Sequence, residues 1–535
     1  MASLLGPDGF MVKVPAAPRS TARMLAAGYA GASVTDPDLA QWRPPLWSAQ
    51  TALSPDRPVL AARIHDLARN DGWASGGVTR QVDAVIGAGW RLSSKPNARS
   101  LKIDPDVASD LASDIEAAWK DFAEDPDCWC DAGRRMTMGG LLALAFRHRL
   151  MDGEALAAIL WLPRGGRYAT AVQVIDPDRL SNPSNSVDTY WRRQGIELGE
   201  HGEPLAYYVR RSHPGDQNVF HPMFWTWERI PRETSFGRRV VVHAFEPGRA
   251  GQYRGVSVLA PIVKRLRMLG RYDEAELQAA VLNAVMAAFV ESPFDHDQFA
   301  SALGGGEELS AYQQQRLDYY QAAPINVGGA KIAFTFPGEK VTLTKPNHPN
   351  SVFEAFERAS LRNIASAMGM TYEQLSMDWG QVNYSSARAA LLEVWRGFTA
   401  RKEHFAQAFM APIYAAWLEE AIDRGIVTLP KGAPDFAQAK AAYCAAKWIG
   451  PGRGWVDPHK EATAATERLA AGLSTLEREC AEQGEDYLET LQQRARERKE
   501  MMALGLNPDA MFGRKAAPSD DHQEKSSDKQ QKALA

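Results

Sequence analysis

The sequence has few cysteines and no long apolar run, and these two absences exclude whole classes of protein. Only four of its 535 residues are cysteines, too few for a disulfide-stapled secreted scaffold. The most apolar stretch, residues 275–290, includes Glu276 and Gln278 and is shorter than the roughly 20 residues that span a bilayer. Residues 1–20 lack the apolar core of a secretory signal. We therefore expect a protein of a reducing cytoplasm, without export by that route and without a membrane anchor.

A strong charge of one sign is also missing. The chain has 61 basic and 65 acidic side chains, a formal net charge of −4. Tight binding of nucleic acid depends on Lys and Arg that neutralise phosphates, and the whole chain has no excess of them. If the protein handles nucleic acid, we expect it to do so loosely. Its 45% of hydrophobic and 24% of charged residues are normal for a globular protein, and its length predicts about three to four compact units.

Motifs for nucleotide binding, nucleophilic catalysis and metal binding are missing as well. No glycine-rich turn ends in Gly-Lys-Ser or Gly-Lys-Thr, no Gly-x-Ser-x-Gly surrounds Ser257, and no His-Glu-x-x-His occurs. Cys128-Trp129-Cys130 lacks the second ligand pair that zinc requires. We predict no catalytic residue, no cofactor and no metal site. The acidic run at 273–276 is expected to be a solvated face or a subunit-interface partner for the nearby arginines.

Hydrophobic periodicity predicts an α+β fold that is predominantly helical. Helical spacing covers residues 60–70, 115–122 and 139–152. The glycine-rich segment 71–77 is expected to break the helix, before a second helical run that ends at Ile86. Short β-like runs cover 157–162, 171–175, 206–209 and 240–244. Short connectors such as Arg164-Gly165-Gly166 join consecutive strands. Because such connectors are too short for a crossover, we expect antiparallel pairing.

Long helices are predicted after residue 259. The first runs to about 289 and is followed by an irregular excursion and by a second helix at 352–368. Four bases crowd into the first of these helices and are expected to form a solvated face: Lys264, Arg265, Arg267 and Arg271. The segment 369–383 is too polar and too interrupted by glycine to be expected in the core. It leads into a helix at 386–423. Pro412 should kink that helix because proline has no backbone donor.

Several segments together resemble the portal proteins of lambda-like tailed bacteriophages or their prophages. They include Arg-His-Arg-Leu-Met-Asp-Gly-Glu at 147–154 and Asn-Tyr-Ser-Ser-Ala-Arg at 383–388, together with residues 67–90, 173–180, 243–259 and 448–458. None of these segments is diagnostic by itself, but their order and spacing over residues 29–507 are specific.

The resemblance implies a portal fold with a wing, stem, clip and crown, assembled as a ring around a central channel. Carried over along the chain, it predicts a partly disordered N-terminal arm at 1–28, the wing at 29–258, a stem helix at 259–292, the clip at 293–350, a second stem helix at 351–369, a tunnel loop at 370–384, a long kinked wing helix at 385–425, a helical crown at 426–512 and a disordered tail at 513–535. The helices and strands predicted from periodicity follow the same order.

The resemblance also implies a function. A portal protein forms a ring at a unique capsid vertex, conducts double-stranded DNA during packaging and ejection, and is not an enzyme. The implied partners are further copies in a ring of twelve, the large terminase subunit, the major capsid and scaffold proteins, head-completion or tail connector proteins, and DNA passing non-specifically, with no membrane. The implied location is the virion, after assembly in the host bacterial cytoplasm. The alternatives are another ring-forming virion connector, such as a head-tail adaptor, and an enzyme of unrecognised type.

The candidate channel residues lie in the polar segment before the long helix. They are Asp378, Trp379, Gln381, Asn383 and Tyr384. The amide and hydroxyl groups could make weak hydrogen bonds to a DNA backbone without trapping it, while Asp378 would repel it. The alternative is that this loop only packs at the subunit interface.

The junction between this loop and the long helix is predicted at Ser385, Ser386 and Arg388. Either serine is expected to cap the helix by accepting a hydrogen bond from a backbone amide. A cation in the first helical turn opposes the helix dipole. Arg388 is therefore expected to have an acidic partner, which the neighbouring subunit could supply.

Overall fold

The structure is a computed structural model that describes residues 3–5, 11–13, 29–216, 221–286, 314, 318, 326–327, 330–331, 353–380, 382–454 and 457–508. The chain divides into two compact units, residues 1–55 and 56–535. Most of the predicted arm and clip, the last residues of the first stem helix, and the whole of the predicted tail lie outside the described residues. The predicted domain boundaries therefore remain predictions.

The described residues of the first unit form short elements. They are β1 (Ser3–Leu5) and β2 (Met11–Lys13), which pair antiparallel, η1 (Ala30–Ala32) and α2 (Ala49–Leu53). Ser48 begins α2 by accepting a hydrogen bond from the Thr51 amide.

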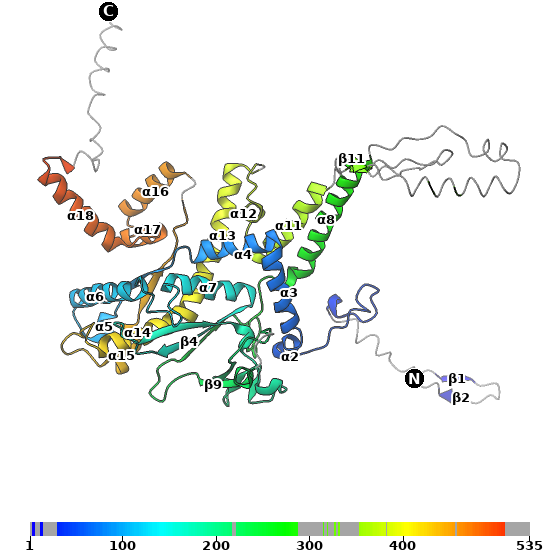
Figure 1. Ribbon diagram of the computed structural model, residues 1–535, viewed down its shortest axis with the longest axis horizontal. Helices are drawn as coiled ribbons and strands as arrows, with labels where there is room; N and C mark the ends of the chain where they lie inside the picture. Colours follow the sequence, from blue (N-terminus) through cyan, green and yellow to red (C-terminus); the bar gives the residue numbers. More distant parts are fainter. Residues whose placement is uncertain are drawn as a thin grey trace, which may run out of the picture. The chain divides into compact units, whose positions relative to one another are not determined.

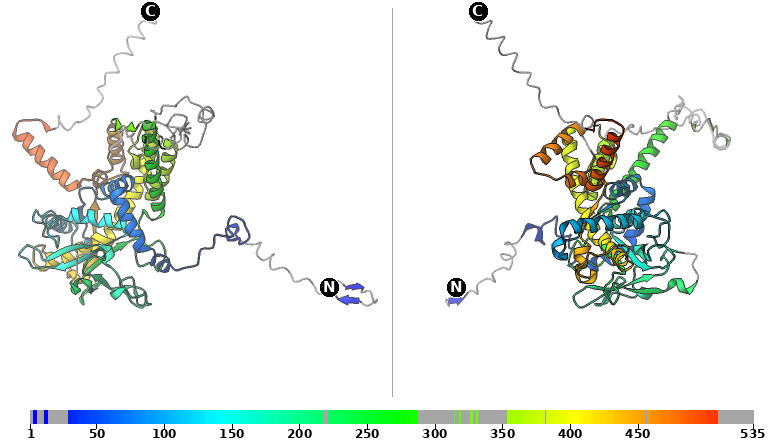
Figure 2. Two further views of the ribbon diagram at one scale, coloured as in Figure 1. Left: turned by 45° about the vertical axis from the view of Figure 1, so that its right-hand side comes forward. Right: turned by 90° about the vertical axis from the view of Figure 1, so that its left-hand side faces the viewer.

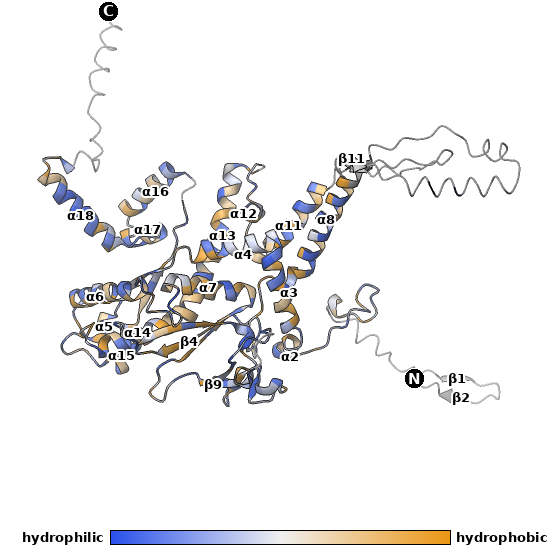
Figure 3. Ribbon diagram, viewed as in Figure 1, coloured by the Kyte–Doolittle hydropathy of each residue, from blue (hydrophilic) through white to orange (hydrophobic). Residues whose placement is uncertain are grey.

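The second unit is organised around a three-stranded antiparallel sheet in the order β10-β4-β5. These strands are β4 (Glu154–Trp161), β5 (Thr170–Ile175) and β10 (Val241–Phe245). Successive residues of the central strand enter two different hydrophobic clusters, Ala155 and Ala157 on one face, Leu156 and Ala158 on the other. Because both faces are buried, β4 is a continuous apolar run rather than an alternating one, and it is coloured mostly orange in Figure 3.

A second antiparallel sheet has the order β6-β7-β8-β9. Its strands are β6 (Arg192–Arg193), β7 (Ile196–Leu198), β8 (Pro204–Arg210) and β9 (Trp227–Pro231), and the short helices η2 (Pro177–Arg179), η3 (Pro183–Asn185) and η4 (Pro222–Trp225) lie in the connections. Every pairing between the described strands is antiparallel, so the predicted antiparallel arrangement is confirmed.

Five helices precede the first sheet in the second unit. They are α3 (Arg57–Asn70), α4 (Gly72–Val85), α5 (Ala98–Leu101), α6 (Pro105–Ala123) and α7 (Met138–Met151). The helices expected at 60–70, 115–122 and 139–152 are confirmed, and so is the helical run that ends near Ile86. The break expected over 71–77 was wrong beyond Asp71, because residues 72–77 form the first turns of α4 despite their three glycines. Asp71 ends α3 and caps α4 by accepting a hydrogen bond from the Ala74 amide at 2.8 Å.

Two long helices lie side by side where the stem was predicted (Figures 1 and 2). They are α8 (Val263–Met286), which follows η5 (Ala260–Ile262), and α11 (Phe353–Met368). The ring of Tyr272 packs against those of Phe353 and Phe356, with centroids 5.5 and 5.1 Å apart. Of the segment between the two helices, the structure describes two short paired strands, β11 (Asn326–Val327) and β12 (Ala330–Lys331).

The long helix predicted at 385–425 is present, but it has three parts. They are α13 (Tyr384–Phe405), a π-helical turn η6 (Ala406–Met410) and α14 (Ala411–Asp423). Pro412 lies at the start of α14 and cannot donate a hydrogen bond to the preceding turn. The wider π-helical turn directly before it accommodates the missing donor. The α-helix is therefore interrupted next to Pro412, and the kink itself stays a prediction. The Trp417 ring of α14 then packs edge-on against Trp119, with centroids 5.0 Å apart.

The C-terminal part returns to the body before it becomes helical again. Its elements are α15 (Phe436–Tyr443), β13 (Ala446–Ile449), α16 (Pro458–Ala470), α17 (Leu476–Glu482) and α18 (Tyr487–Ala503). Strand β13 pairs with β3 (Arg91–Ser94), which brings together the segments at 67–90 and 448–458 that carried part of the resemblance. Among the described residues, no helix combines the length and the apolar character needed to cross a membrane.

Candidate functional site

The C-terminal end of α11 is held by a buried polar link between three helices. The Met368 carbonyl accepts hydrogen bonds from Gln81 Nε2 of α4 at 3.0 Å and from Arg401 Nη1 of α13 at 3.1 Å. The same guanidinium donates to Gln81 Oε1 at 2.9 Å, and Gln81 is fully buried. The last carbonyls of a helix have no hydrogen-bond partner within the helix. Because Gln81 and Arg401 bind the Met368 carbonyl, they fix the point at which the candidate loop begins.

The first half of the predicted tunnel loop is a short helix, α12 (Tyr372–Ser376), rather than an irregular segment. The Thr371 side chain accepts from the Gln374 amide at 3.1 Å, and Gln374 Oε1 accepts from the Thr371 amide at 3.1 Å. Leu375 is fully buried, and a Cβ added at Gly77 would touch its side chain. The prediction that this segment is too polar to join the core was wrong at Leu375, because the capping box orders a helix with an apolar side.

The second half of the loop is exposed and makes few contacts. Met377 ends α12 in the left-handed region at φ 59° and is 61% exposed, and Trp379 is 39% exposed. The Asp378 carboxylate accepts a hydrogen bond from the Gly380 amide at 3.1 Å, so it holds the turn locally. Gln381 lies outside the described residues.

The helix after the loop is capped by Asn383. Its side-chain oxygen accepts a hydrogen bond from the Ser386 amide at 2.9 Å. The cap predicted at Ser385 or Ser386 was therefore wrong, since both serines already lie in the first turn of α13, after Tyr384. Asparagine is as good a cap as serine and stands two to three residues earlier. Arg388, also in this part of α13, is half-buried and forms no ion pair with any described residue.

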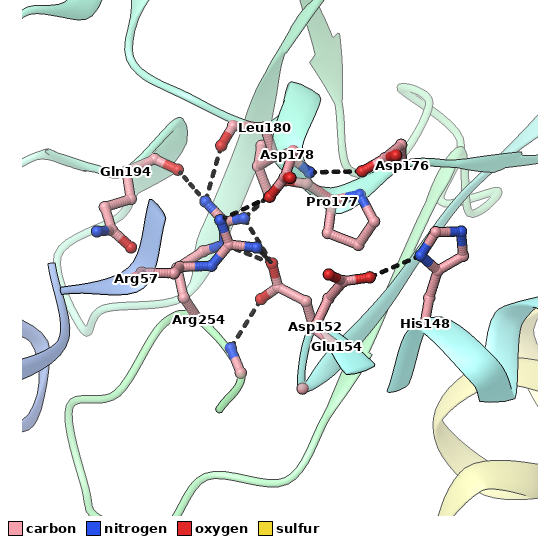
Figure 4. A network of polar contacts seen from close by, with 12 residues as sticks. Arg57, His148, Asp152, Glu154, Asp176, Pro177, Asp178, Leu180, Gln194 and Arg254 are labelled. Atoms are coloured by element: carbon pink, nitrogen blue, oxygen red, sulfur yellow. Dashed lines mark hydrogen bonds and ion pairs between the residues drawn. The ribbon is translucent and has the colours of Figure 1, made fainter. Parts of the chain in front are cut away.

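A second polar site lies at the start of β4, around the fully buried Glu154 (Figure 4). Its Oε1 accepts hydrogen bonds from Arg254 Nε at 2.8 Å and from Arg57 Nη2 at 2.9 Å. Its Oε2 accepts from the Gly255 amide at 2.7 Å and lies 3.0 Å from His243 Nε2. Burial alone would raise the pKa of Glu154, but the two guanidinium groups and His243 hold it well below its ordinary value.

Arg254 connects this carboxylate to the neighbouring connections. It is buried and donates to three backbone carbonyls, those of Pro177 at 2.8 Å, Leu180 at 2.7 Å and Gln194 at 3.1 Å. Burial and the nearby Arg57 lower the pKa of Arg254, but a guanidinium titrates so far above neutrality that it stays charged. The network therefore contains a charged pair whose hydrogen-bonding groups are occupied.

A second buried carboxylate, Asp152, is held by two histidines. His65 Nε2 lies 2.6 Å from Oδ1, and His148 Nδ1 lies 2.7 Å from Oδ2. The hydrogen bond with Asp152 raises the pKa of His65 although burial opposes it. Burial would raise the pKa of Asp152, and the two histidine hydrogen bonds lower it overall.

Potential metal ligands also approach one another here: one oxygen each of Asp176 and Asp178 and a ring nitrogen of His213 all lie within 4.8 Å of each other. Asp178 also forms an ion pair with Arg57 at 3.5 Å. We therefore assign these three side chains to the ion-pair network around Glu154 and not to a metal site.

Two glycines allow the chain to pass close to this network. Gly153 has φ 83°, and a Cβ there would collide with the backbone of Val256, while a Cβ at Gly255 would collide with the Gly153 carbonyl. Glycine is needed at both places because the two backbones touch. The segments 147–154, 173–180 and 243–259, which carried much of the resemblance, therefore meet at one point.

Comparison with known proteins identifies the family to which these segments belong. The sequence model of the family described as phage portal protein, lambda family, matches residues 35–402, more than half of the chain. The chain belongs to the lambda family of phage portal proteins. It is 36% identical over 517 residues to portal protein B of Escherichia phage lambda, covering 95% of this chain and 94% of that protein. It is 35% identical over 516 residues to the portal protein of Escherichia phage N15, covering 95% of both chains.

A more distant relative and a solved structure are also similar to this portal-family chain. The probable portal protein of Halomonas phage phiHAP-1 is 26% identical over 426 residues, which cover 79% of this chain and 75% of that protein. The neck of an empty gene transfer agent particle contains a chain with a TM-score of 0.42 and 13% identity, matched over 88% of this chain and 98% of that one.

Membership of the portal family confirms the resemblance, the α+β portal fold and the absence of enzymatic function in this family. The chain is a structural component of the virion and has a portal ring role in the capsid.

The hydrogen-bonded details around the candidate site were largely missed by sequence reasoning. The Thr371-x-x-Gln374 pattern was a visible signal for a capping box. Gln81 and Arg401 offered no signal because they are 320 residues apart.

Proposed function

We propose that this chain forms a ring of twelve portal subunits whose channel conducts double-stranded DNA, and that the loop from Met377 to Asn383 faces that channel. The observation that carries the proposal is the contrast within the loop: its ends are fixed, and its described residues 377–380 are exposed. The capped helix α12 with its buried Leu375 fixes one end, and the Asn383 cap fixes the other. A loop held in this way could present side chains at a defined radius in each subunit.

The chemistry of the loop supports sliding rather than binding. Between 377 and 383 the only charged side chain is Asp378, and there is no Lys or Arg. Since grip on DNA comes mainly from cations that neutralise phosphates, the loop would touch the duplex through Trp379, Gln381 and Asn383 without trapping it. Tyr384 would act in the same way at the start of α13, while Ser385, Ser386 and Arg388 would set the position of this junction.

The remaining partners follow from the portal role as proposals. The large terminase subunit and the head-completion or tail connector proteins would dock on the clip, and the major capsid and scaffold proteins would surround the wing. Assembly would take place in the host bacterial cytoplasm before the ring enters the capsid.

A charge reversal in the loop tests the proposal. Virions assembled with Asp378→Lys are expected to contain less packaged DNA, because one new cation in every subunit would hold the duplex through salt-sensitive phosphate contacts. Rings should still form, since the Asp378 side chain makes only local hydrogen bonds. The measurements are ring formation by negative-stain microscopy and packaged genome length by gel electrophoresis.

The matched control is Glu200→Lys, which makes the same charge change at an exposed position in the β7–β8 turn of the wing. It is expected to package DNA normally. If both variants form intact rings and package equal amounts of DNA, the proposal that the loop faces the DNA channel is wrong. If the unaltered protein stays monomeric under all assembly conditions, the proposed ring is wrong.

A further inference from the structure

Three bases of α8 form one exposed stripe. Lys264, Arg267 and Arg271 are spaced by three and four residues, so they share one helix face, and all three are exposed. The buried Leu266 and Leu269 lie on the opposite face. Within the described part of the chain, none of the three bases forms an ion pair. This basic stripe therefore points away from the subunit that carries it.

Three carboxylates gather on the other side of the same helix. They are Asp71 at the start of α4, Asp273 of α8 and Glu357 of α11, all half-buried and none paired with a described cation. Burial raises the pKa of Asp273 and Asp71 adds to the rise, and the pKa of Glu357 is raised by burial and then by Asp273 and Glu354. This acidic corner therefore concentrates negative charge that the isolated subunit leaves uncompensated.

The stripe and the corner lie on nearly opposite sides of α8. Asp273 is seven residues after Leu266 and so shares its face, about 150° around the helix from the centre of the basic stripe at 100° per residue. A closed ring of identical subunits requires two different, mutually complementary surfaces on opposite sides of each subunit. A basic surface on one side and an acidic surface on the other meet that requirement.

We propose that, in the portal ring, the basic stripe of one subunit (Lys264, Arg267, Arg271) binds the acidic corner of the next (Asp71, Asp273, Glu357). The inference rests on the ring in the proposed function and adds the residues that join its subunits at the stem. It also gives three of the four bases that crowd into α8 a role other than a solvated face. Each interface would bring opposite charges together at the level where the stem helices leave the wing.

Charge reversal on each side tests the pairing. Arg267→Glu places an anion opposite the acidic corner, and Asp273→Lys places a cation opposite the basic stripe. Because like charges brought together at an interface repel each other and suppress association, each variant alone is expected to give about tenfold fewer rings at low salt. Asp71 is left unchanged because it caps α4. Arg99→Glu, an exposed base on α5, is the matched control and should form rings normally.

Mixing the two defective variants gives the decisive result. In a ring that alternates Arg267→Glu and Asp273→Lys subunits, the introduced glutamate would face the introduced lysine at one interface, and the native Arg267 would face the native Asp273 at the next. Every interface is then complementary, so the mixture is expected to recover rings that neither variant forms alone. Circular dichroism of each variant should show a folded subunit.

The outcomes separate this pairing from the proposed function. Single variants that form rings as well as the unaltered chain would overturn the pairing, and so would a mixture that fails to recover rings. Normal rings from Arg267→Glu that package less DNA would assign the stripe to the duplex and also overturn the pairing. Absence of rings from the unaltered chain would overturn the proposed ring itself and, with it, the pairing.

Discussion

The network around Glu154 and the loop from Met377 to Asn383 use polar side chains in opposite ways. In the network, the buried Glu154 accepts hydrogen bonds from arginines about 100 residues away on either side, and the buried Asp152 lies against the distant His65 and the nearby His148. In the loop, the described polar side chains bond to atoms within a few residues and are exposed. The network therefore fixes the backbone that leads into α8, whereas the loop leaves its side chains available for contacts. Substitutions should therefore affect stability in the network and function in the loop.

The largest loss of stability is expected for Arg254→Met. It leaves Glu154 buried without its main cation, and an unpaired buried charge costs about 3–5 kcal/mol. Urea denaturation followed by circular dichroism measures the loss. Arg229→Met is the matched control, since Arg229 pairs with Glu197 at 2.8 Å on the surface, and exposed pairs contribute about 1 kcal/mol or less. Similar losses in the two variants would contradict the contrast between buried network and surface.

The next largest loss of stability is expected for Gly153→Ala. Alanine would be strained at φ 83° and its Cβ would collide with the backbone of Val256, so we expect a loss of about 2 kcal/mol or more. Gly237→Ala controls for the strain alone, because Gly237 has φ 84° and open space around its Cβ position. If both variants lose the same free energy of unfolding, contact between the two backbones is not what requires glycine at 153.

A pH dependence should follow from the pair of His65 and Asp152. The pKa of His65 is raised in the folded protein, so its contribution is complete below about 6.5 and is lost as the pH rises through the folded value. The pKa of Asp152 is lowered, so its contribution is present above about 4 and is lost as the pH falls through the folded value. Both contributions coexist between these limits.

His65→Gln tests this window by removing the titrating group while keeping a hydrogen-bonding side chain. The unfolding free energy of the unaltered protein should exceed that of the variant by more at pH ~6 than at pH ~9, because a raised pKa stabilises the folded protein most at low pH. A difference between the two proteins that does not change with pH would contradict the assignment to His65.

The smallest effects on stability are expected in the loop. Asn383→Ala removes the helix cap and should cost about 1 kcal/mol, and Trp379→Ala should change stability by less than that. Under the proposed function, Trp379→Ala should nevertheless change packaged DNA length, measured by gel electrophoresis. If Trp379→Ala lowers the free energy of unfolding as much as Arg254→Met does, the proposed difference between the loop and the network is wrong.

Much of the fold could be predicted because its signals are local. The apolar spacing in α6, the short connectors between strands and the lack of an N–H at Pro412 each act within a few residues. The long-range contacts had no such signal: Glu154 and Arg254 are 100 residues apart, and no periodicity connects them. Their positions in the segments that resembled portal proteins were visible, but their pairing was not.

The candidate site was predicted in outline and missed in detail. The polar composition of 369–383 correctly indicated an exposed stretch at Trp379, but it hid the buried Leu375. Serine was chosen as the cap by residue type, although Asn383 competes equally well. The choice depends on the backbone angles of one residue, which composition does not determine.

The π-helical turn at Ala406–Met410 gives the long helix a particular vulnerability in evolution. A π-helical turn holds about one residue more than an α-helical turn but advances about as far around the helix axis. If the same residues wound as a regular α-helix instead, everything before that point would rotate by about 100° about the axis. Arg401 would swing away from the Met368 carbonyl, and the loop would turn with it. Lineages that keep the loop in register should therefore either retain this wide turn or lose it together with a single residue, even where the surrounding sequence has drifted.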